Sequence, residues 1–86
     1  MKTVYSVSLY FKEGTSDKEY HIQLEEEPSG FVVNFQYGRV GSNLNAGTKT
    51  DSPVSLAEAE KIFAKLEKEK RAKGYSDGEK KNPFLT

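Results

Sequence analysis

The chain of 86 residues is 35% hydrophobic and 30% charged, which predicts one small folded domain and argues against intrinsic disorder. Because it has no cysteine, disulfides and thiolate metal sites are excluded, as fits a reducing cytoplasm. Its 13 basic and 13 acidic residues cancel, and this balance taken alone argues against a nucleic-acid ligand.

The charges are unevenly distributed along the chain. Residues 13–27 hold six acids and one base, whereas residues 61–73 hold six bases and two acids. A neutral chain of this kind can still present a basic face. No apolar run approaches the ~18 residues of a membrane helix, and the N-terminal segment lacks the continuous apolar core of a signal peptide. We therefore expect a soluble cytoplasmic protein with no membrane partner.

Strand-like segments occupy the first half of the chain. Apolar and polar residues alternate in residues 4–12, in residues 19–26 and from Phe31 onward, the pattern of strands with one buried face. Short links rich in turn residues join these segments, which predicts hairpins and an antiparallel meander. Two threonines favour a fourth, edge strand over residues 46–51, although Gly47 opposes it.

The apolar period changes after Pro53, and helix signals follow. Ser55 and Glu58 have the spacing of a capping box, and Gly74 is placed to end a helix in the left-handed conformation. The predicted helix covers residues 56–73, about 27 Å. Its apolar stripe consists of Leu56, Ala59, Ile62, Phe63 and Leu66.

Together these elements predict an α+β fold, in which an antiparallel β-sheet, a meander of four or so strands, is packed by one long C-terminal helix. We expect a domain over residues 1–75 and a loose polar tail over residues 76–86. Within that tail, Phe84 and Leu85 are candidates to dock on the core or on a partner.

Catalytic signals are weak. His21 is the single histidine and lies at an outward position of its strand, with no recognisable nucleophile or orienting partner nearby in sequence. One histidine among scattered carboxylates makes no credible metal site. The glycines of residues 38–47 lack the lysine of a phosphate loop. The sequence therefore predicts a non-enzymatic protein with no cofactor and no metal.

The end of the third strand carries a binding signal. Tyr37 supplies a ring that can stack on a base, Gly38 permits close backbone approach, and Arg39 offers forked donors for phosphate. In the loop that follows, Gly41 and Ser42 add backbone and side-chain donors. This set of groups suits a nucleic-acid strand or its terminus.

Further basic residues lie at the projecting end of the predicted helix. Lys70, Arg71 and Lys73 follow the apolar stripe, and Lys49 precedes the helix. If the helix end approaches Arg39, these residues form one basic patch.

Two plainer interpretations stay open. Tyr37 can be the last core aromatic of its strand, and Arg39 can pair with one of the acids of residues 25–27 across a hairpin. The second function to weigh is a protein-interaction module, since tyrosine and arginine are common interface anchors and the acidic region 13–27 can contribute.

The segments "FVVNFQYGRVGS" and "SLAEAEKIFAKLEKEKRAKGY" resemble the WGR domain, named for a Trp-Gly-Arg strand, over about residues 5–75. WGR domains occur in DNA-dependent poly(ADP-ribose) polymerases and in small stand-alone bacterial proteins. The family fold is an antiparallel sheet with one helix, and in the polymerases the domain binds DNA near strand breaks.

The resemblance implies that Tyr37 stacks on a nucleotide, that Gly38 allows close approach and that Arg39 makes a polar contact, with Gly41 and Ser42 shaping the loop. Tyr37 stands where the family has tryptophan, so the ring is smaller and offers a hydroxyl in place of the indole donor. No ADP-ribosyl transferase region is present, so catalysis is not implied.

We therefore expect a small DNA-binding module of modest affinity, with strand ends or nicks as candidate targets. Its expected phosphate contacts are Arg39 and some of Lys49, Lys70, Arg71 and Lys73.

Overall fold

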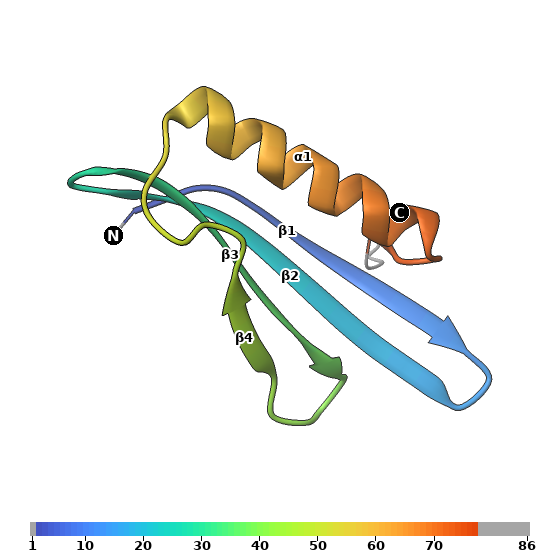
Figure 1. Ribbon diagram of the computed structural model, residues 1–86. Helices are drawn as coiled ribbons and strands as arrows, with labels where there is room; N and C mark the ends of the chain where they lie inside the picture. The colour runs from blue at the N-terminus through green and yellow to red at the C-terminus, as the bar shows by residue number, and fades with distance from the viewer. Residues whose placement is uncertain (1, 78–86) are drawn as a thin grey trace, which may run out of the picture.

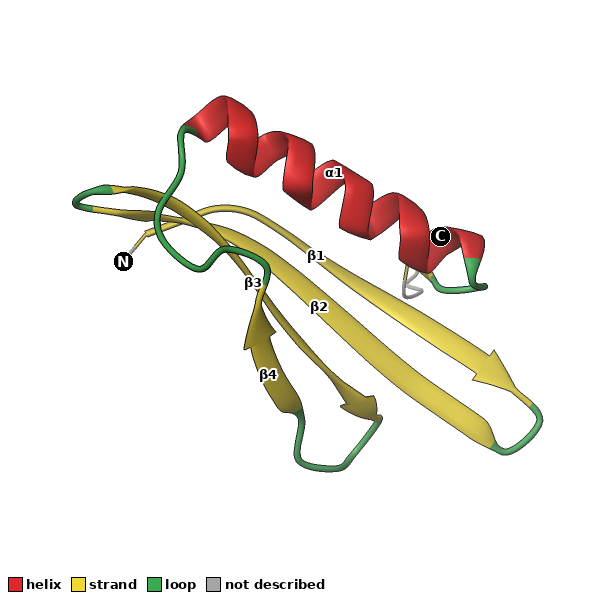
Figure 2. Ribbon diagram, in the orientation of Figure 1, coloured by secondary structure: helices red, strands yellow, loops and turns green. Residues whose placement is uncertain are grey.

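The computed structural model describes residues 2–77, which form a sheet layer and one helix packed on a single face of it (Figure 1 and Figure 2). The elements are β1 (Lys2–Glu13), β2 (Ser16–Glu27), β3 (Gly30–Arg39), β4 (Asn45–Thr48), α1 (Leu56–Ala72) and β5 (Ser76–Asp77). The sheet is antiparallel with the order β4-β3-β2-β1-β5. The predicted α+β fold is confirmed, with a helix of 17 residues that is moderate rather than long.

The core lies between the sheet and α1. Alternation along each strand sends every second side chain toward the helix, so Leu9, Ile22, Leu24 and Val33 are fully buried there. From α1, Ala59 and Leu66 complete this buried layer, flanked by partly buried neighbours that include Ile62 and Phe63. Leu56 is an exception to the predicted apolar stripe, because its side chain is 39% exposed at the start of the helix.

Both ends of α1 follow their local signals. The Ser55 hydroxyl accepts a hydrogen bond from the backbone N–H of Glu58 (3.2 Å), as predicted for the N-cap. The helix ends at Ala72, and Gly74 has φ +110°, a conformation that side chains disfavour. This glycine redirects the chain back toward the sheet.

The fourth strand is shorter than predicted, ending at Thr48 instead of residue 51. Gly47 lies directly against the Phe35 ring, and an added Cβ would approach ring atoms to 2.6 Å. The glycine that opposed a strand by propensity is therefore what lets β4 pack on Phe35. Thr50 follows as a buried residue whose hydroxyl accepts from the backbone N–H of Val33 (3.3 Å).

A fifth strand was not predicted. Ser76 and Asp77 pair with Tyr10 and Leu9 on the edge of β1. The rest of the predicted tail, with Phe84 and Leu85, lies outside the described residues. Within residues 2–77, no helix combines the length and apolarity needed to cross a bilayer.

Candidate nucleic-acid interface

The aromatic-Gly-Arg segment lies at the end of β3, on the same face of the sheet as the core. Val33 is buried on this face under α1. Two steps of alternation further along is Tyr37, 41% exposed, and a third step reaches Arg39, also exposed. Figure 1 shows that this end of β3 lies away from the helix. The interpretation of Tyr37 as a core aromatic is therefore wrong.

Five aromatic rings follow one another across this end of the sheet. Tyr20 stacks with both Phe35 and Tyr37, at centroid distances of 5.7 Å and interplanar angles of 12° and 18°. Tyr75 meets Tyr20 edge-on at 6.0 Å, and Phe11 lies 5.6 Å from Tyr75. We call these five residues the aromatic row. It runs from the β4 side of the sheet to β1, with Tyr37 as its most exposed ring.

Three lysines lie over rings of the aromatic row. The ammonium of Lys70 is 4.6 Å from the centroid of Tyr20, that of Lys49 is 5.7 Å from Phe35, and that of Lys18 is 5.8 Å from Phe11. These distances are within the range of cation–π attraction. The aromatic surface therefore also carries positive charge, which can pair with the phosphates of a nucleic acid.

Burial and like charge act on the groups at the centre of this surface. Burial lowers the pKa of Lys70, and the charges of Lys73 and Lys49 lower it further, while Glu69 opposes them. Burial likewise raises the pKa of Tyr20, with contributions from Tyr37 and Tyr75.

Arg39 has no acidic partner among residues 2–77. The acids of residues 25–27 lie at the opposite end of the hairpin, because Glu27 pairs with Gly30 beside the turn (Figure 1). Nine steps of extended strand, about 30 Å, separate Gly30 from Arg39. The alternative in which Arg39 pairs with residues 25–27 is therefore wrong. Its cross-strand partner is Lys18, a like charge.

The loop after β3 begins with a tight turn. The backbone N–H of Ser42 donates to the carbonyl of Arg39 (3.0 Å), and Gly41 has φ +88° within that turn. Gly38 faces the loop as it returns, since an added Cβ would lie 3.2 Å from Leu44. A glycine at position 38 therefore lets the returning loop pack closely against β3.

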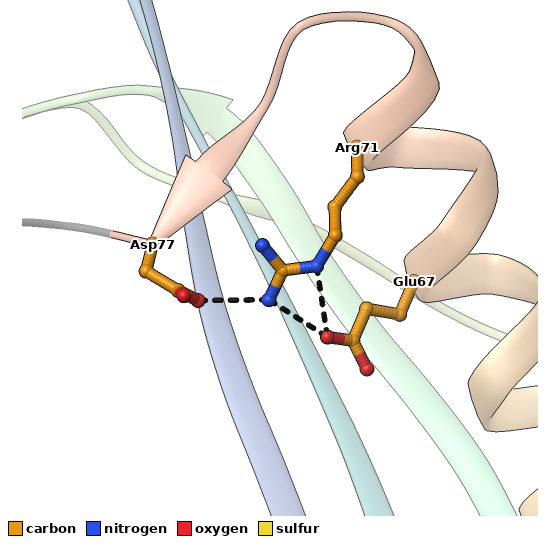
Figure 3. Close-up of polar contacts among 3 residues, drawn as sticks. All are labelled: Glu67, Arg71 and Asp77. Atoms are coloured by element: carbon orange, nitrogen blue, oxygen red, sulfur yellow. Dashed lines mark hydrogen bonds and ion pairs between the residues drawn. The ribbon is translucent and has the colours of Figure 1, made fainter.

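Arg71 is paired with two carboxylates of the chain itself. Its guanidinium donates to Glu67 Oε2 (2.8 and 3.0 Å) and to Asp77 Oδ1 (2.9 Å), as Figure 3 shows. The hydrogen bonds that Arg71 donates, first to Asp77 and second to Glu67, raise the pKa of Arg71. These bonds link the last turn of α1 to β5 at the β1 edge of the sheet.

Sequence reasoning missed several members of this surface, namely Phe11, Lys18, Tyr20 and Phe35. One signal was available for Lys18. Counting residues back from the turn at Pro28 and Ser29 places Lys18 opposite Arg39 in an unbroken antiparallel ladder, as the structure confirms. Phe11, Tyr20 and Phe35 were assigned to the core faces of their strands. No local sequence pattern indicates that their rings lie in one row with Tyr37.

The opposite face of the sheet holds His21 in a hydrogen-bonded position. Its Nε2 lies 2.6 Å from Glu19 Oε1 and its Nδ1 lies 2.8 Å from Ser8 Oγ. The expectation of no orienting partner nearby in sequence is therefore wrong, because Glu19 is two residues away on the same strand. Ser8 comes from the neighbouring strand. Among residues 2–77, no three metal-ligating side chains gather into a cluster.

The fold and this surface define a small α+β binding module with an aromatic, basic face. The family model described as the WGR domain matches residues 5–82, nearly the whole chain, and the protein belongs to the WGR domain family. The WGR domain is a module of the nucleic-acid-binding type. Comparisons with curated proteins and with solved structures gave no significant match.

Proposed function

We propose that the protein is a non-enzymatic DNA-binding module that recognises strand ends or nicks through the exposed end of its aromatic row. One observation carries the proposal: Tyr37 presents a partly exposed ring beside Arg39, and no acid among residues 2–77 pairs with that arginine. The WGR family membership supports a nucleic-acid ligand.

Each group has a distinct part in the proposed contact. The Tyr37 ring stacks on a base, and the Arg39 guanidinium donates to a phosphate. Gly41 and Ser42 keep the turn after β3 narrow beside that phosphate. Lys49 adds positive charge near the bound strand. The helix-end lysines, Lys70 and Lys73, add charge on the other side of Tyr37.

Arg71 has another part in this proposal. Its guanidinium is already bonded to two carboxylates, so we assign it to holding β5 and the helix end in place. This makes Arg71 a useful control, because its removal changes the charge of the chain without removing a proposed DNA contact.

Ends and nicks are the proposed forms because Tyr37 needs an uncovered base face. Inside a continuous duplex both faces of every base are stacked, and unstacking one costs a few kcal/mol. A terminus or a nick supplies such a face at lower cost. The preference therefore follows from the Tyr37 ring being partly exposed while it packs against Tyr20 and Phe35.

Fluorescence anisotropy tests the proposal with four labelled DNAs. Three are duplexes of equal length, one with blunt ends, one with a nick and one continuous with hairpin-closed ends, and the fourth is a single strand. Each is measured at two salt concentrations. We expect the nicked or open-ended DNA to bind more tightly than the closed duplex, and affinity to fall with salt. Binding of all four forms at background level would refute the function.

A protein-interaction module is the second candidate. Val40, next to Arg39, is 41% exposed like Tyr37, so a small apolar patch with interface-type residues is present. The charges near Tyr37 are mainly cationic, however, with Lys70, Lys49 and Lys18 over neighbouring rings. A positively charged surface of this kind favours DNA over a protein partner of mixed charge.

A further inference from the structure

A second concave site lies beside the proposed DNA contact, between the end of α1 and the paired ends of β1 and β2. It is an open hollow of about 300 Å³, lined by Phe11, Lys18, Lys70, Lys73 and Tyr75. Figure 1 shows the C-terminal end of α1 passing above this part of β1. Two aromatic rings and three ammonium-bearing side chains therefore meet in one small volume.

The backbone fixes the shape of this hollow. Gly74 turns the chain with φ +110°, and it lies so close to Phe11 that an added Cβ would be 2.8 Å from the ring. The backbone N–H of Tyr75 donates to the carbonyl of Lys70 (3.1 Å), which holds the Tyr75 ring against Phe11. The two aromatic walls are thus set by the helix end.

The lysines of the hollow have no anion within the described chain. Among residues 2–77, none of Lys18, Lys70 and Lys73 forms an ion pair or a side-chain hydrogen bond with a carboxylate. Lys18 also lies directly opposite Arg39 across the β2–β3 ladder, and like charges in that position repel. Glu69 is the acid that acts on Lys70, and burial together with the neighbouring lysines still lowers the pKa of Lys70.

The ligand group that best fits these three ammonium groups is a phosphate. Lysine ammoniums bind phosphate as point charges with several donors each, and an anion placed among them relieves their mutual repulsion. The aromatic walls suit the apolar edge of a sugar or base attached to that phosphate. A bare apolar ligand would leave the ammoniums unsatisfied, and an acidic side chain would not use the rings.

We propose that this hollow, at the end of α1, is a second subsite that binds a phosphate group of the DNA strand whose base stacks on Tyr37. The proposal rests on the proposed function for the source of the phosphate. Tyr20 links the two positions, since its ring contacts both Tyr37 and Tyr75. Lys18, Phe11 and Tyr75 are the residues that this subsite adds to the DNA contact.

The first experiment titrates the whole protein, labelled with ¹⁵N, with inorganic phosphate, with pyrophosphate and with a short 5′-phosphorylated oligonucleotide. We expect all three to shift the amide resonances around Lys18 and Lys73, and only the oligonucleotide to shift those of residues 37–42 as well. Shifts scattered over exposed lysines in all three titrations would overturn the subsite. This titration uses the wild-type protein, so its result does not depend on the folding of a variant.

The second experiment compares the salt dependence of DNA binding for Lys18→Gln, Lys73→Gln and the control Lys68→Gln, which removes an exposed lysine that does not line the hollow. Each hollow variant is expected to reduce the slope by about 0.7 on a single strand. The control removes an equal charge elsewhere and should change the slope much less. Equal slopes for all three variants would overturn the subsite.

The two proposals fail in different ways. If the wild type binds no DNA but phosphate shifts map to the hollow, the DNA function fails and the phosphate comes from a free compound. If DNA binding depends on Tyr37 while the hollow variants match Lys68→Gln, the proposed function stands and the subsite is rejected.

Discussion

The ammonium of Lys70, in the last turn of α1, lies 4.6 Å from the centroid of the Tyr20 ring on β2. This contact joins the end of the helix to the centre of the aromatic row, because Tyr20 also stacks on Tyr37. A cation is thereby fixed one ring away from the exposed tyrosine, in a position where burial lowers the pKa of Lys70.

Lys70→Met is expected to weaken DNA binding without destabilising the fold. The loss of one phosphate contact should lower the salt slope by about 0.9 on duplex DNA. Stability should change little, about 0.5 kcal/mol or less, because methionine keeps the apolar stem and removes a charge disfavoured by burial. Anisotropy and urea denaturation check the two results, with Lys68→Met as the exposed control. A loss of both binding and stability would contradict this account.

Tyr37→Ala should weaken binding to a nicked duplex about 5- to 150-fold, which corresponds to the ~1–3 kcal/mol of one base stack. Tyr37→Trp should bind at least as tightly as the wild type, since a larger ring stacks over more area. Tyr5→Ala is the matched control, because Tyr5 is also about half exposed but packs near Phe63, away from the aromatic row. Equal effects of Tyr37→Ala and Tyr5→Ala would indicate general loss of structure.

Arg39→Gln and Arg71→Gln remove the same charge and should behave differently. Arg39→Gln is expected to reduce the salt slope on duplex DNA by about 0.9. Arg71→Gln should leave binding close to wild type and lower stability by less than about 1 kcal/mol, because it loses exposed bonds to Glu67 and Asp77. Measurements of DNA affinity and of unfolding on both variants test whether Arg39 contacts DNA and Arg71 has a structural part. It would be reversed if Arg71→Gln gave the larger change in slope.

Thr50→Val should destabilise the fold by about 1–3 kcal/mol, since it leaves the backbone N–H of Val33 without its acceptor at a buried position. Thr50→Ser keeps the hydroxyl and serves as the control, with a smaller loss from the missing methyl group. Urea unfolding measures both. Equal stability of Thr50→Val and the wild type would show that the Val33 N–H finds another partner.

The raised pKa of Tyr20 predicts a loss of stability at alkaline pH. The unfolded chain releases this proton near the ordinary tyrosine pKa of 10.0, whereas the folded protein retains it to higher pH. The stabilising contribution is therefore complete below pH 10.0 and is lost as pH rises through the folded pKa. Tyr20→Phe should show a smaller alkaline loss than Tyr5→Phe in parallel thermal unfolding scans. Identical pH profiles would exclude this linkage.

Local patterns of the sequence were sufficient for most of the secondary structure. Alternation in β1 to β3, the Ser55 cap and Gly74 depend on neighbouring residues, and such signals are readable without knowing the fold. Alternation placed Tyr37 on the core face of its strand and left open whether its ring is buried. Its exposure depends on α1 lying away from this end of β3 (Figure 1). The two-residue β5 could not be predicted, because its pairing with Tyr10 depends on where the helix returns the chain.

The sequence by itself determined that a ring, a glycine and an arginine stand at the end of a strand, because alternation and strand length are local properties. Only the tertiary structure decided what surrounds them. Antiparallel register set Lys18 beside Arg39 and carried the acids of residues 25–27 to the far end of the hairpin. The packing of α1 then brought Lys70 over Tyr20. These contacts join residues distant in the chain, so burial and register had to be fixed before the charge of the surface was defined.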